Sequence, residues 1–280
     1  MTLPVSVVIL AKDAAATLGA TLASVATLSD DVHVVDSGSS DATLEIARAA
    51  GARISAHPFE SYGAQRNWAI ENLPLRHPWE LHLDADERVS PALDAALRTL
   101  FADGPPAGVD GYAIPRLVHF LGRPIRHGGM YPIWHLRLFR RGRGRCERRR
   151  YDQHFYLDGP TGRIDAPMID DIRLPLAEWT ARHNRWSEAA VAEMLDPTAE
   201  GVIDPTRDDP IARRRALRGR YERLPPFLRP LLLFLYRYLW RGGFRDGVPG
   251  LIFFVLQTFW FHFLIDAKLW ERRRGERTPP

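Results

Sequence analysis

Cysteine is almost absent from this sequence of 280 residues, and the single copy, Cys146, excludes an intramolecular disulfide. A zinc site built on several cysteines is excluded for the same reason. The first residues, MTLPVSVVILAKD, also lack the basic segment of a signal peptide, and their apolar run ends at Lys12. We therefore expect the working part of the chain to lie in a reducing, cytoplasmic compartment.

Positive charge is scarce at the front of the chain and abundant later. Residues 1–100 contain 7 Lys or Arg and 13 Asp or Glu, whereas residues 116–150 contain 11 Arg and one Glu. Residues 211–280 contain 15 basic and 5 acidic residues. This asymmetry favours phosphates or anionic lipid as partners of the later regions. A general compositional bias toward arginine is the alternative explanation for the scattered ones.

Apolar, β-branched segments alternate with helical patterns through the first hundred residues, which predicts an α/β fold with helices on both faces of a sheet. The expected strands are VSVVIL, VHVVD, ARIS and WELHLD, and the expected helices cover residues 14–26, 41–51, 61–73 and 91–102, the last capped by Ser90. In such sheets ligands bind beyond the carboxyl ends of the strands. Polar residues that follow strands should therefore gather at one rim.

Later residues predict a different organisation. Extended segments with glycine turns are expected over residues 111–129, 134–146 and 152–160, and an amphipathic helix is expected over residues 178–195. We expect a first domain over 1–195, divided into the parts 1–110 and 111–195. A proline-rich linker (196–212) should follow, and then a helical region (213–280).

The last of these regions is rich in apolar and aromatic residues. The stretch 247–265 has no formal charge over 19 residues, a length near that of a membrane span. Its proline, glycine, glutamine and histidine, with arginines on both sides, favour a helix lying in the membrane interface over one that crosses the bilayer. Packing of a helical hairpin on the first domain or on a second subunit is the alternative.

The sequence LHLDADERV places Asp84, Asp86 and Glu87 directly after a buried strand. Like charges this close are unfavourable unless a cation relieves them. Mg²⁺ or Mn²⁺ suits such a site, because hard cations are held by one or two carboxylates together with substrate phosphates. Asp36 at the end of the second strand could accept a hydrogen bond from the N3–H of uracil, and Arg66 could pair with phosphate or cap a base. The structural alternatives are that the paired aspartates belong to a surface loop, that Asp36 only begins a turn, and that Arg66 is an exposed helix charge.

Four motifs together resemble a known family: SVVILAKDAAATL, VVDSGSSDAT, GAQRNWA and LHLDADERV. They are similar to the N-terminal half of the family 2 glycosyltransferases, whose GT-A fold is a nucleotide-binding mixed sheet flanked by helices. The stretch FLGRPIRHGGMYPIWHLRLFRRGRGRCE resembles the bacterial branch with lipopolysaccharide-core glucosyltransferases and capsule and exopolysaccharide enzymes. The resemblance covers residues 3–195. It implies that the first domain is catalytic, with a nucleotide-binding half (1–110) and an acceptor half (111–195).

The resemblance implies a role for each matching residue. Asp36 would meet the uracil, Arg66 and Lys12 the nucleotide, Asp84 the ribose or the metal, and Asp86 the metal on the diphosphate. Lys12 stands where many members have Asn or another polar residue.

An inverting transfer also needs a carboxylate to take the proton of the attacking hydroxyl. Asp152 and Glu147 are both available in CERRRYDQHF, and we favour Asp152. His154 could complete the metal shell or contact phosphate, although a lone histidine is more often structural.

The sequence thus predicts a metal-dependent, inverting glycosyltransferase that uses a nucleotide sugar, UDP-linked, and a lipid-linked or glycolipid acceptor. We expect it at the cytoplasmic face of the bacterial inner membrane, as a peripheral or monotopic protein, with oligomerisation open and no nucleic-acid partner. A nucleotidyltransferase is one alternative, but LAKDAAATL lacks the Gly-rich basic loop such enzymes carry after the first strand. A non-catalytic nucleotide-binding scaffold is the other.

Overall fold

The computed structural model describes residues 2–196 and 210–275. The chain divides into two compact units, which we call the sheet unit and the helical unit. The sheet unit consists of Met1–Gly122, Pro132–Glu147 and His154–Arg173, and the helical unit of Arg123–Tyr131, Arg148–Gln153 and Leu174–Pro280.

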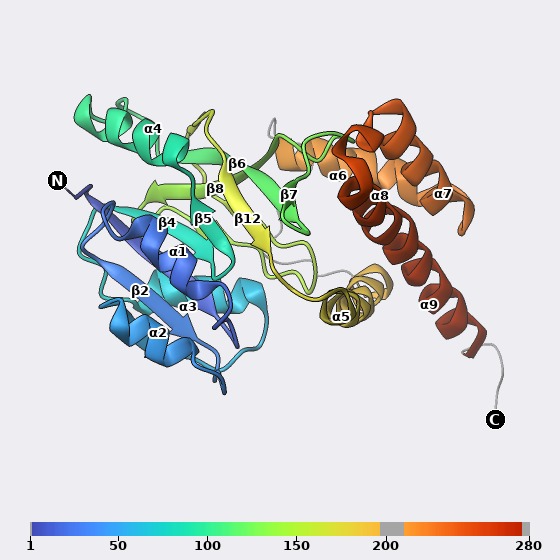
Figure 1. Cartoon of the computed structure of the whole chain (residues 1–280), viewed down its shortest axis with the longest axis horizontal. Helices are drawn as coiled ribbons and strands as arrows, with labels where there is room; N and C mark the ends of the chain where they lie inside the picture. The colour runs from blue at the N-terminus through green and yellow to red at the C-terminus, as the bar shows by residue number, and fades with distance from the viewer. Residues whose placement is uncertain (1, 197–209, 276–280) are drawn as a thin grey trace. The chain divides into compact units, whose positions relative to one another are not determined.

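A mixed sheet forms the sheet unit, in the strand order β3-β2-β1-β4-β8-β6-β12-β5 with β11 beside β6 (Figure 1). The pairs among β3, β2, β1 and β4 are all parallel, and β8 joins β4 and β6 antiparallel. A separate two-stranded pair joins β9 and β10. The strands are β1 (Val5–Ala11), β2 (Val32–Asp36), β3 (Arg53–Ala56), β4 (Trp79–Asp84), β5 (Glu87–Val89), β6 (Gly111–Phe120), β8 (Ile133–Arg140), β9 (Arg145–Cys146), β10 (Phe155–Tyr156), β11 (Thr161–Arg163) and β12 (Met168–Ile172).

Helices cover both faces of this sheet, as the sequence predicts. They are α1 (Leu18–Val25), α2 (Thr43–Ala49), α3 (Tyr62–Asn72) and α4 (Pro91–Ala102). Ser90 caps α4 as expected, since its hydroxyl accepts a hydrogen bond of 3.1 Å from the Leu93 amide. Ser61 caps α3 in the same way through the Ala64 amide. The α/β expectation for the front of the chain is therefore confirmed.

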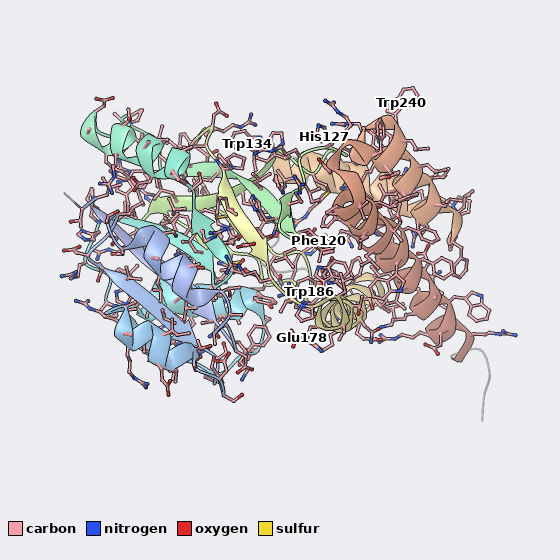
Figure 2. All side chains as sticks on the ribbon, in the orientation of Figure 1. Phe120, His127, Trp134, Glu178, Trp186 and Trp240 are labelled. Atoms are coloured by element: carbon pink, nitrogen blue, oxygen red, sulfur yellow. The ribbon has the colours of Figure 1, made fainter. Side chains whose placement is uncertain are left out.

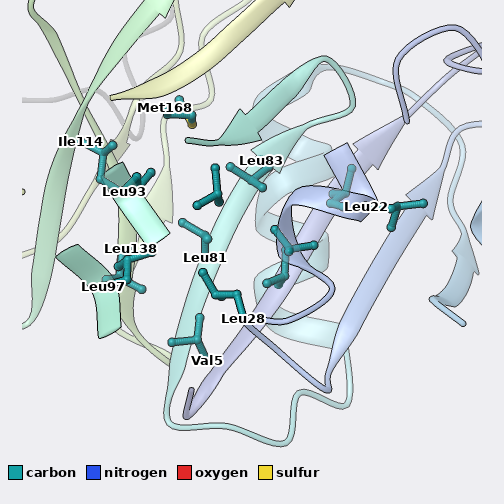
Figure 3. Packing of buried hydrophobic residues seen from close by; sticks show 14 of the residues in the cluster. Val5, Leu22, Leu28, Leu81, Leu83, Leu93, Leu97, Ile114, Leu138 and Met168 are labelled. Atoms are coloured by element: carbon teal, nitrogen blue, oxygen red, sulfur yellow. The ribbon is translucent and has the colours of Figure 1, made fainter. Parts of the chain in front are cut away.

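The alternation of β1 explains why the sheet has helices on both sides. Val7 and Ile9 belong to the core that contains α1 and α4, whereas Val8 and Leu10 pack with Ala69 of α3 on the opposite face. Figure 3 shows part of the first core, with side chains from α1, α4 and the strands interdigitated. With both faces covered, the free positions for ligands are the loops at the strand ends.

The helical unit holds the C-terminal helices and one short strand. Its elements are β7 (Arg123–Pro124), α5 (Leu176–Leu195), α6 (Pro210–Glu222), α7 (Leu228–Leu235), the π-helix η1 (Tyr236–Trp240), the 3₁₀ helix η2 (Gly243–Asp246), α8 (Gly247–Phe254), the π-helix η3 (Val255–Trp260) and α9 (Phe261–Gly275). Helix α9 packs on α5 through Phe261, Ile265 and Leu269 against Ala190 and Val191.

The predicted domain ranges for the C-terminal part of the chain can be compared with the two compact units. Helix α5 was expected in the domain 1–195, and it belongs to the helical unit. Most of the expected linker 196–212 lies outside the described residues, so the predicted domain ranges stay a prediction.

The continuous helical stretch Gly243–Arg274 is long and apolar enough to cross a membrane by length and composition.

Candidate active site

The loops after β1 and β2 are tied together by hydrogen bonds. The Asp13 carboxylate accepts from the Ser40 amide at 2.8 Å, and the Asp41 carboxylate accepts from the Ala15 amide at 3.0 Å. Lys12 donates through Nζ to the Gly38 carbonyl. Gly38 has a φ of +86°, a backbone conformation that favours glycine. Lys12 is thereby held against the loop that follows Asp36.

Asp36 is buried at the end of β2 and organises that loop. Its carboxylate accepts hydrogen bonds from the amides of Gly38 at 2.8 Å and Ser39 at 3.0 Å, and from the Ser39 hydroxyl at 2.5 Å. These bonds fix the position of the carboxylate at the rim. A uracil N3–H would have to share an oxygen that already accepts a bond.

The sequence Asp84-Ala85-Asp86 forms the end of β4 and the turn into β5, beside two buried arginines. Arg66 on α3 and Arg137 on β8 both donate to the Asp84 carboxylate, Arg137 at 3.1 Å. Arg137 also donates to Glu87 at 2.6 Å, and the other Glu87 oxygen accepts from the Asp84 amide at 2.8 Å. Asp84 and Arg66, predicted as site residues, are thus in direct contact.

This cluster sets the charge of each member. Burial works to raise the pKa of Asp84, but the positive charges of Arg66 and Arg137 outweigh it and lower that pKa. Burial raises the pKa of Glu87, and Arg137 opposes this only in part. Burial would lower the pKa of Arg137, but the Glu87 and Asp84 carboxylates raise it above its usual value. Asp84 is therefore ionised and balanced by two guanidinium groups.

Asp86 is the second aspartate of this turn. Its side chain is half-buried, and its carbonyl accepts a hydrogen bond of 2.9 Å from the Asp171 amide, which fixes the turn. No group of three or more His, Cys, Asp or Glu side chains is arranged to hold a metal within residues 2–196 and 210–275. A divalent cation held by one or two carboxylates and completed by a diphosphate does fit the turn, because such ions need few protein ligands.

Two buried donors of the cluster have hydrogen-bonding capacity left. Arg66 Nη1 and Arg137 Nε are buried, and neither has a hydrogen-bond partner in the described part of the chain. The Arg66 guanidinium also lies over the Phe155 ring, 4.7 Å from its centroid. Unsatisfied buried donors are rare in folded proteins, so they suit an anionic ligand.

Sequence reasoning missed Arg137. It is one of eleven arginines in residues 116–150, and nothing local distinguishes it from its neighbours. The alternation of β8 gives no signal either, because the neighbours Leu136 and Leu138 belong to different hydrophobic cores and the pairing with β6 is irregular at this point.

Glu147 and His154 form a second polar pair in the sheet unit. Glu147 is fully buried, accepts a hydrogen bond of 3.0 Å from the His154 amide and lies 3.6 Å from the ring nitrogen Nδ1 of His154. The His154 ring stacks on His135 with a centroid distance of 5.8 Å. The proposed metal or phosphate role of His154 stays a prediction.

Asp152 lies in the helical unit, so the two candidates for the base belong to different units. Its carboxylate pairs with Arg218 of α6 at 3.3 Å, and its backbone φ is +60°. Burial would lower the pKa of Arg218, but Asp152 and Glu222 raise it above its usual value. The choice between Asp152 and Glu147 as the base stays a prediction.

The single cysteine is structural. Cys146 is buried, and its backbone exchanges two hydrogen bonds of 2.8 Å with the side chain of Asn67 on α3. Burial raises the pKa of Cys146 to about 11, so the nucleophilic thiolate is scarce at neutral pH. Cys146 therefore does not serve as a nucleophile.

Comparisons with known proteins agree with this arrangement. The family model described as Glycosyl transferase family 2 matches residues 6–158. The lipopolysaccharide core biosynthesis glycosyltransferase LpsC of Rhizobium meliloti is 25% identical over 284 residues, which is 99% of this chain and 96% of LpsC. An uncharacterized glycosyltransferase of Rickettsia felis is 37% identical over 98 residues, 35% of this chain and 34% of its own length.

A solved structure extends the likeness to the whole fold. The mannosyltransferase PcManGT from Pyrobaculum calidifontis, in complex with GDP-Man and Mn²⁺, matches with a TM-score of 0.51 and 15% identity over 96% of this chain and 87% of that one. At this identity the likeness concerns the fold, and it confirms the expected GT-A arrangement of a mixed sheet flanked by helices. Since the family model spans more than half of the chain, the protein is a glycosyltransferase that belongs to glycosyl transferase family 2.

Proposed function

We propose that this enzyme is a metal-dependent, inverting glycosyltransferase that moves a sugar from a nucleotide sugar to a membrane-associated glycan acceptor. The observation that carries the proposal is the buried cluster at the Asp84-Ala85-Asp86 turn. There Arg66 and Arg137 neutralise Asp84, and the turn carries a second carboxylate, Asp86, that would contact a cation. The guanidinium groups would bind the diphosphate, and the carboxylates of the turn would bind its cation.

The donor we propose is UDP-linked. Asp36 at the end of β2 would accept from the uracil base, while Lys12 and Arg66 would meet the phosphates or the ribose. The tied loops after β1 and β2 support this assignment, because they fix the backbone around Asp36. PcManGT is solved with a guanine nucleotide sugar, so UDP and GDP must be compared directly.

Asp86 and Asp84 would hold Mg²⁺ or Mn²⁺, with His154 as a further candidate ligand. A divalent cation there supplies neutralisation of the charge that develops on the departing diphosphate. The Arg66 and Arg137 guanidinium groups would add charge-assisted hydrogen bonds to the same leaving group.

The base removes the proton of the acceptor hydroxyl as the oxygen attacks the anomeric carbon. A bond forms between that oxygen and the carbon while the bond from the carbon to the diphosphate oxygen breaks, and the nucleoside diphosphate leaves with the electron pair. A single displacement of this kind inverts the anomeric centre. Asp152 is the first candidate for the base and Glu147 the second.

The acceptor is the third part of the proposal. LpsC is named for lipopolysaccharide core biosynthesis, and we extend that context to this chain, with a lipid-linked or glycolipid acceptor in cell-surface polysaccharide assembly. The enzyme would then work at the cytoplasmic face of the inner membrane, held there by its helical unit.

Calorimetric titration with UDP and with GDP, with and without Mn²⁺, tests the donor site. Wild type should bind UDP in a metal-dependent manner, Asp86→Ala should lose that binding, and the exposed Asp103→Ala should keep it. Absence of nucleotide binding, or binding indifferent to Mn²⁺ and to Asp86→Ala, would refute the proposal.

Turnover then separates the remaining alternatives. Asp152→Asn and Glu147→Gln should each bind UDP, and the variant of the true base should lose transfer from a UDP sugar. Nucleotide binding without any transfer by wild type would indicate a non-catalytic scaffold. Family membership already disfavours the nucleotidyltransferase, which would prefer a nucleoside triphosphate with a sugar phosphate.

A further inference from the structure

Large apolar side chains are exposed mainly in the helical unit. In the described part of the sheet unit the exposed large apolar residues are Phe59, Tyr62 and Leu121, whereas the segment from α7 to α9 exposes many more. Trp240 at the end of η1 is 84% exposed, and Val248 at the start of α8 is 69% exposed. Figure 2 shows the Trp240 side chain projecting away from the helices.

These side chains recur at helical spacing. Leu231, Leu235 and Leu239 are exposed at four-residue intervals along α7 and η1, and Val248 and Val255 are exposed seven residues apart along α8 and η3. With Trp240, we call these six residues the apolar face. It is the outer side of a helical hairpin, because inward rings hold its two arms together: Phe234 with Phe259 and Tyr238 with Phe254, at centroid distances of 6.5 and 6.1 Å.

The arginines of α7 and η1 point toward the interior of the helical unit, whereas an ordinary surface helix exposes its charged side chains and buries its apolar ones. Arg229 is buried and bonded to the Asp266 carboxylate at 2.9 Å. Arg237 is half-buried and contacts the sulfur of Met130 at 2.6 Å. An exposed surface that is apolar while its arginines are enclosed indicates an apolar partner.

Exposed arginines instead lie at the ends of the hairpin. Arg220 and Arg223 precede α7, and Arg241 and Arg245 lie in the connection between η1 and α8. An anionic lipid surface attracts each such residue by about 1 kcal/mol. Trp240 borders the second pair, as tryptophan does at membrane interfaces. The apolar face edged by positive charge matches an anionic bilayer rather than a second copy of this basic chain.

The hairpin is suited to lie in the interface and not to cross it. Helix α7 has 8 residues and η1 has 5, which gives a length of about 20 Å against a hydrocarbon core of about 30 Å. The stretch Gly243–Arg274 is long enough, but its polar contacts argue against crossing. Lys268 and Arg272 pair with Glu188 of α5, so a crossing helix would bring these charges toward the hydrocarbon.

We propose that the apolar face inserts into the interfacial layer of an anionic bilayer, with Arg241 and Arg245 on the headgroups, and that the chain does not span the membrane. This inference rests on the proposed function in one respect: the inserted apolar face would bring the enzyme to a lipid-linked acceptor. The insertion itself does not depend on the transferase reaction.

Flotation of the full-length protein with vesicles tests this surface. Wild type should float with phosphatidylglycerol-containing vesicles and bind neutral phosphatidylcholine vesicles about tenfold more weakly. Leu239→Ser/Trp240→Ser should weaken binding to the anionic vesicles at least about tenfold. The matched pair Phe59→Ser/Tyr62→Ser removes exposed aromatic residues from the sheet unit and should bind as wild type does.

A second pair of variants tests the contribution of the arginines to vesicle binding. Arg241→Gln/Arg245→Gln should lose much of the preference for anionic vesicles, whereas the exposed pair Arg48→Gln/Arg143→Gln should keep it. Circular dichroism and the UDP titration on the same proteins, without vesicles, show whether each variant is folded. Because these readouts are independent, a protein that floats without binding UDP refutes only the proposed function.

Three outcomes would overturn the inference. The first is vesicle binding that Leu239→Ser/Trp240→Ser leaves unchanged. The second is a wild-type dimer in light scattering that the same substitution dissociates, with no vesicle affinity in either protein. The third is protein that resists alkaline extraction from vesicles and leaves a protease-protected fragment, because a spanning helix behaves in that way.

Discussion

Arg137 on β8 donates a hydrogen bond of 3.1 Å to Asp84 at the end of β4, and both residues lie in the sheet unit. The same guanidinium nitrogen reaches Glu87 at 2.6 Å, so one side chain positions two carboxylates of the turn. Asp86 sits between those two carboxylates in the sequence. The conformation of the proposed metal site therefore depends on an arginine that belongs to a different strand.

Arg137→Lys should weaken Mn²⁺-dependent UDP binding by about tenfold to a hundredfold, the effect of losing one charge-assisted hydrogen bond. Lysine keeps the charge, but its ammonium group lacks the rigid planar geometry with which the guanidinium holds its donors in place. Arg137→Met should weaken it further, and Arg143→Met, an exposed arginine, should not change it. Calorimetry measures the binding, and thermal unfolding identifies variants that are merely unfolded. Equal UDP affinity in folded Arg137→Lys and wild type would contradict the positioning role.

Ser90→Ala should lower the free energy of unfolding by about 1 kcal/mol, because it removes the acceptor for the Leu93 amide at the start of α4. Thr99→Ala in the same helix is the control. Thr99 is exposed, and its replacement should change stability by less than about 0.5 kcal/mol. Urea unfolding measures both, and equal losses in the two variants would show that the cap contributes nothing special.

The local patterns of the front half determined much of the predicted fold. Strands such as VSVVIL alternate between two cores, and Ser90-Pro91 begins α4, so nearby residues carry the information. The later strands could be predicted only as extended segments. Strand β5 shows why, because its three residues pair with β12, about eighty positions away, and no local sequence signal encodes that pairing.

The same distinction holds for the candidate site. The contact between Arg66 and Asp84 follows from a helix and a strand whose ends meet at one rim, and it could be anticipated. The contact of Arg137 with the same carboxylate depends on β8 inserting antiparallel beside β4. That insertion is a property of the whole sheet, so the role of Arg137 could not be predicted from the residues next to it in the sequence.

Acid should destabilise this protein in part through Asp31. This buried carboxylate accepts hydrogen bonds from the Ser6 hydroxyl at 2.6 Å and the Arg76 amide at 2.8 Å, and it lies 3.1 Å from His33. Burial works to raise the pKa of Asp31, but these partners lower it well below its usual range. The folded-state pKa lies below the unfolded value of about 3.9, so the stabilisation is complete above about pH 5 and is lost as the pH falls further.

Asp31→Asn should therefore show a flatter decline of unfolding free energy than wild type between pH 5 and pH 3. The exposed Asp103→Asn should follow the wild-type curve. Urea unfolding at a series of pH values measures the slopes. If Asp31→Asn does not fold, Arg76→Gln removes the hydrogen bond of 3.1 Å that Arg76 Nε donates to Asp31 and should reduce the slope by a smaller amount. Parallel curves for wild type and both Asp31→Asn and Arg76→Gln would rule out Asp31 as a source of acid sensitivity.

The buried ion pair of the helical unit should behave as a coupled unit. Arg229 and Asp266 are both buried, and Asp266 also accepts a hydrogen bond of 2.9 Å from the Phe227 amide. Arg229→Met or Asp266→Leu alone should cost about 3–5 kcal/mol, since each leaves an uncompensated buried charge. The double variant Arg229→Met/Asp266→Leu should cost less than the two single losses together, because no buried charge remains.

A double-mutant cycle by urea unfolding, in solution without lipid, measures this coupling. The i,i+4 pair Asp94 and Arg98 on α4 is the control, because both side chains are about a third exposed and water screens their interaction. The cycle on that pair should be additive within experimental error. If the Arg229 and Asp266 cycle were additive as well, their bond would not join α7 to α9. The aromatic contacts between the arms, among them Phe227 with Phe263 and Phe234 with Phe259, would then carry more of that connection.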